Sequence, residues 1–215
     1  MASKSKRNQA KFKWTKELIF LIVFVVGLII ITVVLAIPSK SSKNLNKYNE
    51  AITAYNTANS TSYTTLTKDN VYEEIDGNYD NQVESLVKLA KSDKYTYVFY
   101  GALDNPTFLE QLSNVNTYAK NYEIEKVYIF LANYVKDAEA NSETSTSTYN
   151  TKLKEYNKQI NEGIDKDCKE FDMATYPALL AFKDGKLVYN TQIDTKAEYT
   201  WNQYINKVFG LEKLK

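Results

Sequence analysis

A run of twenty residues without a charged side chain, from Leu18 to Ile37, constrains this chain more than any other feature. Only Gly27 and Thr32 interrupt its apolar character, so a helix formed by this run would have no polar face. At a rise of about 1.5 Å per residue such a helix would be about 30 Å long, which matches the hydrocarbon core of a bilayer. The sequence therefore predicts a transmembrane helix at Leu18 to Ile37, with the lipid bilayer as its partner.

The residues before this run indicate its orientation. Residues 1–17 contain six Lys or Arg and one Glu, and Trp14 stands at the expected level of the interface. Because basic flanks stay in the cytoplasm, we expect a single-pass protein of the cell membrane whose C-terminal part is extracytoplasmic. A cleaved signal peptide is the alternative, since Val34 to Ala36 resembles a cleavage site, although the apolar run is longer than signal peptides usually have.

The composition excludes several kinds of active site. The chain has no His, which removes the commonest general base, the commonest metal ligand and the His-based catalytic triads. Its one Cys, Cys168, rules out an internal disulfide, a Cys-x-x-Cys redox centre and a thiolate zinc site. We therefore expect no catalytic residues, no metal and no cofactor.

The charge distribution argues against a nucleic-acid partner. The first 38 residues hold six Lys or Arg and one Glu, which leaves 21 basic and 25 acidic residues and a net charge of about −4 beyond them. A protein that binds duplex nucleic acid needs a concentrated basic face to neutralise phosphates. No such cluster follows Lys16, so we expect no nucleic acid.

Polar segments divide the rest of the chain. Residues 38–65 are rich in Ser, Thr, Asn and Lys and contain few large aliphatic residues, so we predict a polar stalk that could contain a short helix around Leu45 to Ala58. Residues 66–215 have the composition of one globular domain. Inside this domain, a Ser/Thr-rich stretch at about 133–150 is predicted to be a surface insertion.

Residues 66–215 alternate between short apolar runs and segments of helical period, which predicts an α/β architecture. Asn105 is a candidate N-cap with Pro106 at the first helical position, and Asp184-Gly185 suits a tight turn between two strands. Thr195 and Glu198 form a candidate capping box for the last helix. The predicted elements are a helix at Val83–Leu89, a strand at Tyr95–Tyr100, a helix at Pro106–Tyr122, a strand at Val127–Leu131, a helix at Leu153–Phe171 that Gly163 could break, strands at Ala178–Phe182 and Leu187–Tyr189, and a helix through Trp201 and Val208.

Two stretches of this pattern carry a family resemblance. The segment from Tyr176 to Val188 (YPALLAFKDGKLV) resembles the part of thioredoxin in which a cis-proline precedes a strand, a tight turn and the last strand. The segment from Val98 to Thr107 (VFYGALDNPT) lies where thioredoxins have a strand, the Trp-Cys-Gly-Pro-Cys motif and a helix. The chain is thus similar to the membrane-tethered thioredoxin-like proteins of bacteria. The resemblance implies a three-layer α/β/α sandwich with a central mixed sheet.

The resemblance also implies a degenerate active site. Its motif positions are occupied by Leu103, Asp104, Asn105, Pro106 and Thr107, so the proline is retained and both cysteines are absent. Thiol exchange needs an attacking thiolate and a second, resolving thiol. The resemblance therefore implies a domain without dithiol chemistry.

The remaining surface could still bind a polypeptide. In thioredoxin-like proteins the residue before the cis-proline offers its backbone to an extended chain. Carried over, this residue would be Tyr176, with Pro177 beside it, and the groove would be completed by Leu103, Asp104 and Asn105. A purely structural interpretation competes with this one, in which Pro177 sets a tight connection and Asp104 and Asn105 only cap the helix. For Cys168, core packing on an apolar stripe competes with a reactive thiol.

These observations predict a tethered, redox-inactive module that binds a protein or peptide during envelope assembly or export. One alternative is a subunit assisting thiol-disulfide exchange in cell-envelope redox homeostasis, with cysteines from a partner or with Cys168 alone. The other alternative is a structural spacer whose role lies in the anchor and stalk.

Overall fold

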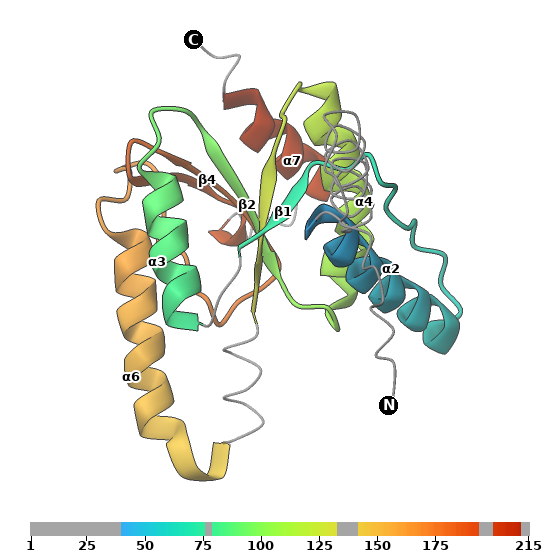
Figure 1. Cartoon of the computed structure of the whole chain (residues 1–215). Helices are drawn as coiled ribbons and strands as arrows, with labels where there is room; N and C mark the ends of the chain where they lie inside the picture. Colours follow the sequence, from blue (N-terminus) through green and yellow to red (C-terminus); the bar gives the residue numbers. More distant parts are fainter. Residues whose placement is uncertain (1–39, 76–78, 133–141, 194–199, 212–215) are drawn as a thin grey trace, which may run out of the picture. The chain divides into compact units, whose positions relative to one another are not determined.

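The computed structural model describes residues 40–75, 79–132, 142–193 and 200–211. These residues form a mixed α/β domain, which confirms the predicted fold class at this level (Figure 1). In chain order the elements are α2 (Lys40–Asn59), β1 (Tyr72–Glu74), α3 (Tyr79–Ala90), β2 (Thr96–Gly101), α4 (Pro106–Asn121), β3 (Val127–Leu131), α6 (Ser142–Asn161), β4 (Ala178–Lys183), β5 (Lys186–Asn190), the 3-10 helix η1 (Thr191–Ile193) and α7 (Trp201–Phe209).

The five strands form one mixed sheet in the order β1-β3-β2-β4-β5. Strands β1, β3 and β2 are parallel, whereas β4 is antiparallel to β2 and β5 is antiparallel to β4. Strand β2 therefore lies at the centre, and all six of its residues are buried. A continuously apolar or aromatic strand is what a sheet covered on both faces requires.

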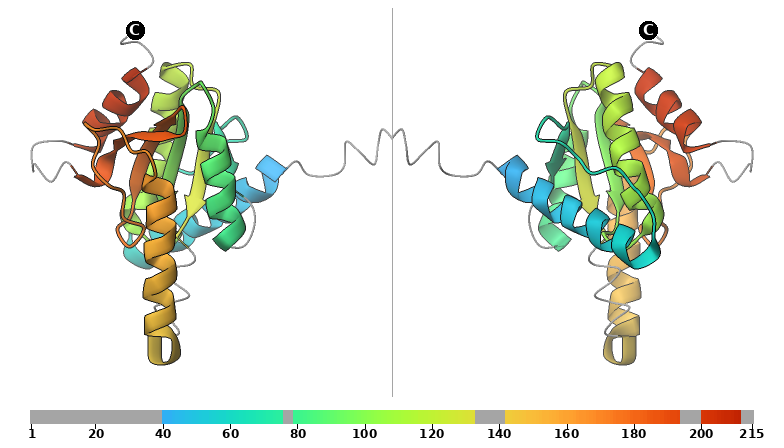
Figure 2. Two further views of the ribbon diagram at one scale, coloured as in Figure 1. Left: turned by 90° about the vertical axis from the view of Figure 1, so that its left-hand side faces the viewer. Right: turned by 90° about the vertical axis from the view of Figure 1, so that its right-hand side faces the viewer.

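Helices cover both faces of this sheet. Helices α3 and α6 lie side by side on one face, and α2, α4 and α7 lie on the other (Figures 1 and 2). The side chains of β2 alternate between two hydrophobic clusters: Tyr97 and Phe99 point into the cluster beneath α4 and α7, and Val98 and Tyr100 into the cluster beneath α3 and α6. The sheet thus separates two hydrophobic cores and contributes side chains to both.

Local signals placed several of these elements correctly. Asn105 is the N-cap of α4, and its side chain accepts a hydrogen bond from the Phe108 N–H at 2.8 Å, while Pro106 is the first helical residue. The turn between β4 and β5 has Asp184 and Gly185 at positive φ (52° and 79°), as a two-residue hairpin turn requires.

The prediction of a polar stalk needs correction. From Lys40 to Asn59 the chain is helix α2, which contacts α4 and β1 and belongs to the folded unit that begins at Lys40. Leu45, Tyr48 and Ile52 are buried in the cluster beneath α4. With spacings of three and four residues they form a narrow apolar face, about one residue per turn, which a polar average composition conceals.

The segment after α2 runs back along the helix and is held by asparagine side chains. The Asn49 amide donates to the Leu66 carbonyl at 2.9 Å and accepts the Leu66 N–H at 2.8 Å. Asn56 makes the same pair of bonds with Tyr63, both at 2.9 Å. These bonds satisfy the backbone of a segment that has no strand beside it, and they lead the chain into β1, which at three residues was too short to predict.

Two further predictions need correction, and a third is not tested. The Ser/Thr-rich stretch is helical from Ser142 onward as part of α6, and residues 133–141 lie outside the described residues. Serine and threonine cost little inside a helix once a packed segment has nucleated it. The same helix ends at Asn161, before Gly163 at φ +69°, so Cys168 is not on a helix. Helix α7 begins at Trp201, and the expected capping box at 195–198 lies outside the described residues.

Among the described residues, no helix has the length and apolar character needed to cross a bilayer. The predicted cytoplasmic segment (1–17) and transmembrane helix (18–37) lie outside the part of the chain that the structure describes.

We expect Ile52→Ala to destabilise the whole domain, because a fully buried side chain of α2 would leave a cavity in the main cluster. The free energy of unfolding, measured by urea denaturation, should fall by about 2–4 kcal/mol. Thr53→Ala changes the neighbouring exposed position and should have almost no effect. Equal stability of the two variants would show that α2 is a stalk after all.

Candidate functional site

The register of the sheet brings the two predicted halves of the site together. Tyr100, near the end of β2, is paired with Ala178, the first residue of β4. The ring of Tyr100 also meets the ring of Tyr176 edge to face, with centroids 6.2 Å apart. The turn that follows β2 therefore lies beside the Tyr176–Pro177 segment that precedes β4. We call this pair of segments, 101–107 and 173–177, the candidate edge.

One side of the candidate edge is the turn into α4. Gly101 packs directly against the Phe108 ring, since an added Cβ would lie 2.2 Å from a ring carbon. Asn105 is committed to capping, so that part of the structural interpretation is confirmed. Asp104 and Pro106 are exposed, and Leu103 and Thr107 are half-buried. The turn thus presents a carboxylate, that of Asp104, and a hydroxyl, that of Thr107, at the two positions where the family resemblance would require cysteines.

The other side is the segment that ends at Pro177. The Tyr176–Pro177 peptide bond is cis, and both residues are half-buried. The buried Tyr100 hydroxyl donates to the Met173 carbonyl at 2.6 Å, and its ring meets the Phe171 ring edge to face. Strand β2 therefore anchors this segment directly, through one side chain.

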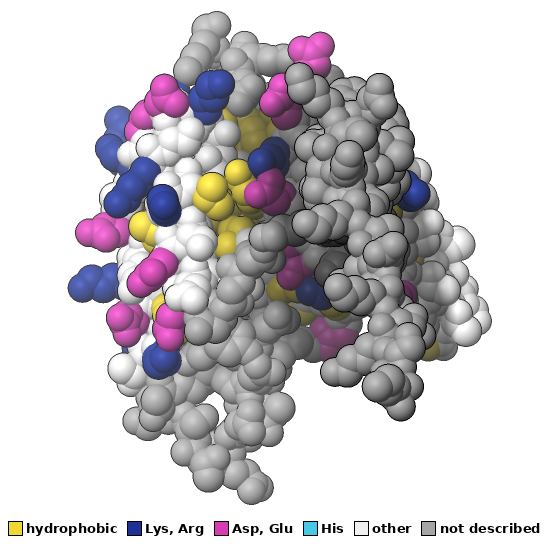
Figure 3. Space-filling model, viewed as in Figure 1, with side chains coloured by type: hydrophobic (Ala, Val, Ile, Leu, Met, Phe, Trp, Pro, Cys, Tyr) yellow, Lys and Arg dark blue, Asp and Glu magenta, His cyan; other side chains and the backbone are white. Residues whose placement is uncertain are grey.

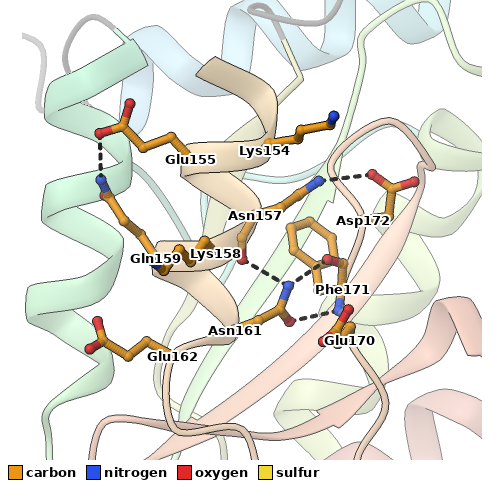
Figure 4. Close-up of a pocket in the computed structure, with 10 residues that line it drawn as sticks. All are labelled: Lys154, Glu155, Asn157, Lys158, Gln159, Asn161, Glu162, Glu170, Phe171 and Asp172. Carbon is orange, nitrogen blue, oxygen red and sulfur yellow. Dashed lines mark hydrogen bonds between the residues drawn. The ribbon is translucent and has the colours of Figure 1, made fainter. Parts of the chain in front are cut away.

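Helix α6 holds the same segment from outside with two amides. The Asn161 side chain accepts the Phe171 N–H at 2.7 Å and donates to the Phe171 carbonyl at 2.8 Å (Figure 4). One turn earlier, Asn157 accepts the Met173 N–H at 2.9 Å and donates to the Asp172 carboxylate at 3.1 Å. Because side chains four residues apart share a helix face, the two amides act on the segment like a neighbouring strand.

The residues that follow β5 hold the segment before Pro177 from a third direction. The Gln192 side chain accepts the Asp172 N–H at 2.8 Å and donates to two carbonyls, those of Asp172 (2.8 Å) and Thr175. Its neighbour Thr191 is buried and accepts the N–H of Leu179, two residues after Pro177, at 2.8 Å. The clamp formed by Thr191 and Gln192 therefore fixes the chain on both sides of Tyr176 and Pro177.

Sequence reasoning identified the edge but missed the side chains that position it. Asn157 and Asn161 each follow a residue of the apolar stripe of α6, Tyr156 and Ile160, so they lie at the border of its buried face. Paired amides at such a border are a usable signal, because a buried amide must find partners. Gln192 had no comparable signal, because its partners come from a distant irregular segment.

Cys168 is half-buried in the turn after α6 and contacts the cluster beneath α3 and α6. Burial, with a smaller contribution from the nearby Asp165 carboxylate, raises the pKa of its thiol to about 11. A thiol with this pKa is almost wholly protonated at neutral pH and is a poor nucleophile. The structure therefore favours the packing interpretation of Cys168.

The described residues of the candidate edge offer hydrogen-bonding groups and surface charge. Within the described ranges, no group of three or more Cys, Asp and Glu side chains is arranged to hold a metal ion.

Comparison with known proteins finds no family model and no curated protein that matches this chain. Its function must therefore be inferred from its own residues.

We expect Gln192→Glu to weaken the candidate edge at neutral pH, because a carboxylate cannot donate to the carbonyls of Asp172 and Thr175. The cost in unfolding free energy should be about 1–2 kcal/mol. The new carboxyl would have a raised pKa in the folded state, so the lost stability should return as the pH falls below about 4.3, where the group is protonated in both states.

The matched control is Gln203→Glu, at a side chain whose oxygen accepts the Thr200 N–H at 2.7 Å at the start of α7. A carboxylate keeps this bond and suits a helix N-terminus, so no loss of stability is expected. Each variant is compared with the parent chain by urea denaturation across the pH range. A pH-independent loss for Gln192→Glu would contradict the role of the donated bonds.

Cys168 should react slowly with iodoacetamide in the folded chain, because little of the thiol is ionised. At neutral pH we expect alkylation to be about a hundredfold slower than in the urea-unfolded chain. Mass spectrometry of timed samples measures both rates. An equal rate in the folded chain would contradict the raised pKa of Cys168, and a faster rate would identify it as an activated thiol.

Proposed function

We propose that this chain is a membrane-tethered, thioredoxin-like binding module that holds an extended polypeptide outside the cell membrane and performs no thiol chemistry. The observation that carries the proposal is the pairing of Tyr100 with Ala178. The family resemblance requires the motif turn and the proline segment to be neighbours, and this register supports it. The mixed sheet with helices on both faces agrees with the same family.

Binding would use the backbone at Tyr176, as it does in the proteins that the chain resembles. An extended peptide could lie along the candidate edge and form strand-like hydrogen bonds there, with Leu103 offering an apolar contact from the opposite side. Tyr100, Asn157, Asn161 and Gln192 support this role because they hold the edge in one conformation before a ligand arrives. A preformed edge loses less conformational entropy on binding.

Two observations speak against thiol-disulfide exchange. Asp104 and Thr107 occupy the motif positions where a dithiol enzyme needs cysteines. Cys168 has a raised pKa and lies on a different segment, in the turn after α6. The spacer alternative is weakened as well, since α2 packs into the domain through Leu45, Tyr48 and Ile52 and does not form a separate stalk.

Tethering is part of the proposal and rests on the uncharged run from Leu18 to Ile37 with its basic N-terminal flank. This arrangement would place the domain on the extracytoplasmic side, where polypeptides are unfolded during envelope assembly or export. The bilayer and an extended polypeptide would then be its two partners.

The test is site-specific photo-crosslinking of the full-length chain in lipid nanodiscs to unstructured synthetic peptides. With p-benzoylphenylalanine in place of Tyr176 we expect saturable crosslinks to the peptides. The matched control carries the same photoreactive group in place of Tyr118, a half-buried tyrosine in the C-terminal half of α4. Equal labelling at the two positions, or none at Tyr176, would overturn the proposal.

A further inference from the structure

A polar hollow adjoins the candidate edge. It has a volume of about 1060 Å³ and lies between the C-terminal half of α6 and the segment that leads to Tyr176 (Figure 4). Its lining residues are Lys154, Glu155, Asn157, Lys158, Gln159, Asn161, Glu162, Glu170, Phe171 and Asp172. Since Glu170, Phe171 and Asp172 continue directly into the candidate edge, a chain bound at the edge would reach this hollow.

The hollow carries an excess of negative charge. Four of its lining residues are carboxylates and two are lysines, a net charge of −2. Glu162 and Glu170 are exposed. Asn157 and Asn161 are already bonded to the backbone of the segment, so the charged groups are what a partner would meet first. On the opposite side of the edge, one of the exposed residues of the turn is another carboxylate, Asp104.

The chain segments that form the edge supply no compensating cation. No Lys or Arg occurs between Lys94 and Lys120, or between Lys169 and Lys183, although the chain has 27 such residues in 215. The strands and turns of the candidate edge are therefore acidic or neutral throughout. Among the residues that line the hollow, positive charge comes from α6 alone, through Lys154 and Lys158.

A second hollow of the domain is more apolar than the hollow beside the candidate edge. A hollow of about 670 Å³ beside α3 is lined by apolar Ile75 and Leu89 together with Tyr128, with lysines and glutamates at its rim (Figure 3). It contains none of the candidate-edge residues, and nothing in the structure shows what covers it. The charge argument therefore applies to the hollow beside the edge.

We propose that the polypeptide bound at the candidate edge is cationic, with lysine or arginine side chains that lie over this hollow and near Asp104. The inference rests on the proposed function and adds the chemical class of the partner. A small apolar ligand does not fit a hollow lined by six charged side chains, whereas a basic extended segment complements both its charge and its continuity with the edge. Each exposed ion pair adds roughly a 1.4- to fivefold gain in affinity.

The test compares three fluorescent peptides with the same apolar residues and either Lys, Ser or Glu at the intervening positions. Fluorescence anisotropy measures their binding to the full chain in nanodiscs of zwitterionic lipid, which removes attraction between the Lys peptide and the bilayer. We expect the Lys peptide to bind most tightly and the Glu peptide most weakly. The difference should shrink as salt screens the exposed charges.

Paired variants test whether the hollow is responsible. The double variant Glu162→Gln with Glu170→Gln should weaken binding of the Lys peptide about three- to tenfold and leave the Ser peptide unchanged. Lys154→Gln with Lys158→Gln should strengthen binding of the Lys peptide. The control with an equal change of charge is Glu84→Gln with Glu125→Gln, two exposed residues that do not line the hollow.

The outcomes separate this inference from the function on which it rests. Equal binding of the Lys and Ser peptides would overturn the cationic preference and leave peptide binding standing. Equal weakening by the control double variant would also overturn it, because net charge and not the hollow would then be responsible. Binding of none of the three peptides would overturn the proposed function itself.

Discussion

The structure depends on one constraint, the burial of β2 on both faces and along both edges. Every residue of this strand is buried, so its backbone groups need partners that water cannot supply. Strand β3 supplies them in parallel and β4 in antiparallel orientation. The antiparallel partner must begin where β2 ends, which places Ala178 opposite Tyr100 and brings the turn at Gly101 beside Pro177. The candidate edge is thus a consequence of how the core is closed.

Side-chain amides supply hydrogen-bond partners to the backbone of the irregular segments, as the neighbouring strands do for β2. Asn49 and Asn56 hold the segment after α2, and Asn157, Asn161 and Gln192 hold the segment before β4. An amide can donate and accept at once, so it matches both polar groups of a peptide unit. The chain has six glycines and three prolines, few residues with which to shape tight turns. The two described connections after α2 and before β4 are instead held by helices that present asparagine to the backbone.

The fold could be predicted from the sequence where one local signal dominated. Strands β2 and β3 are continuously apolar or aromatic, and α4 combines a cap, an N-terminal proline and a regular buried stripe. The prediction failed where stability comes from distant partners. Helix α2 buries one residue per turn, and its polar majority concealed that face; β1 has three residues and is a strand only because β3 lies beside it. At the site, the edge followed from the resemblance, but the amides that position it depend on contacts with residues ten or more positions away in the chain.

The turn into α4 keeps its shape for reasons that do not involve thiols. Asn105 satisfies the first turn of the helix, Pro106 has no N–H that would need a partner, and Gly101 allows Phe108 to pack against the end of β2. The opposite segment is fixed by Tyr100 from the core and by amides from α6 and the end of β5. A redox-active turn needs its cysteines for reactivity, whereas this turn needs only its cap and its packing for structure. The proposed recognition edge would therefore stay rigid without dithiol chemistry, and the charge around it would be the property that distinguishes one polypeptide from another.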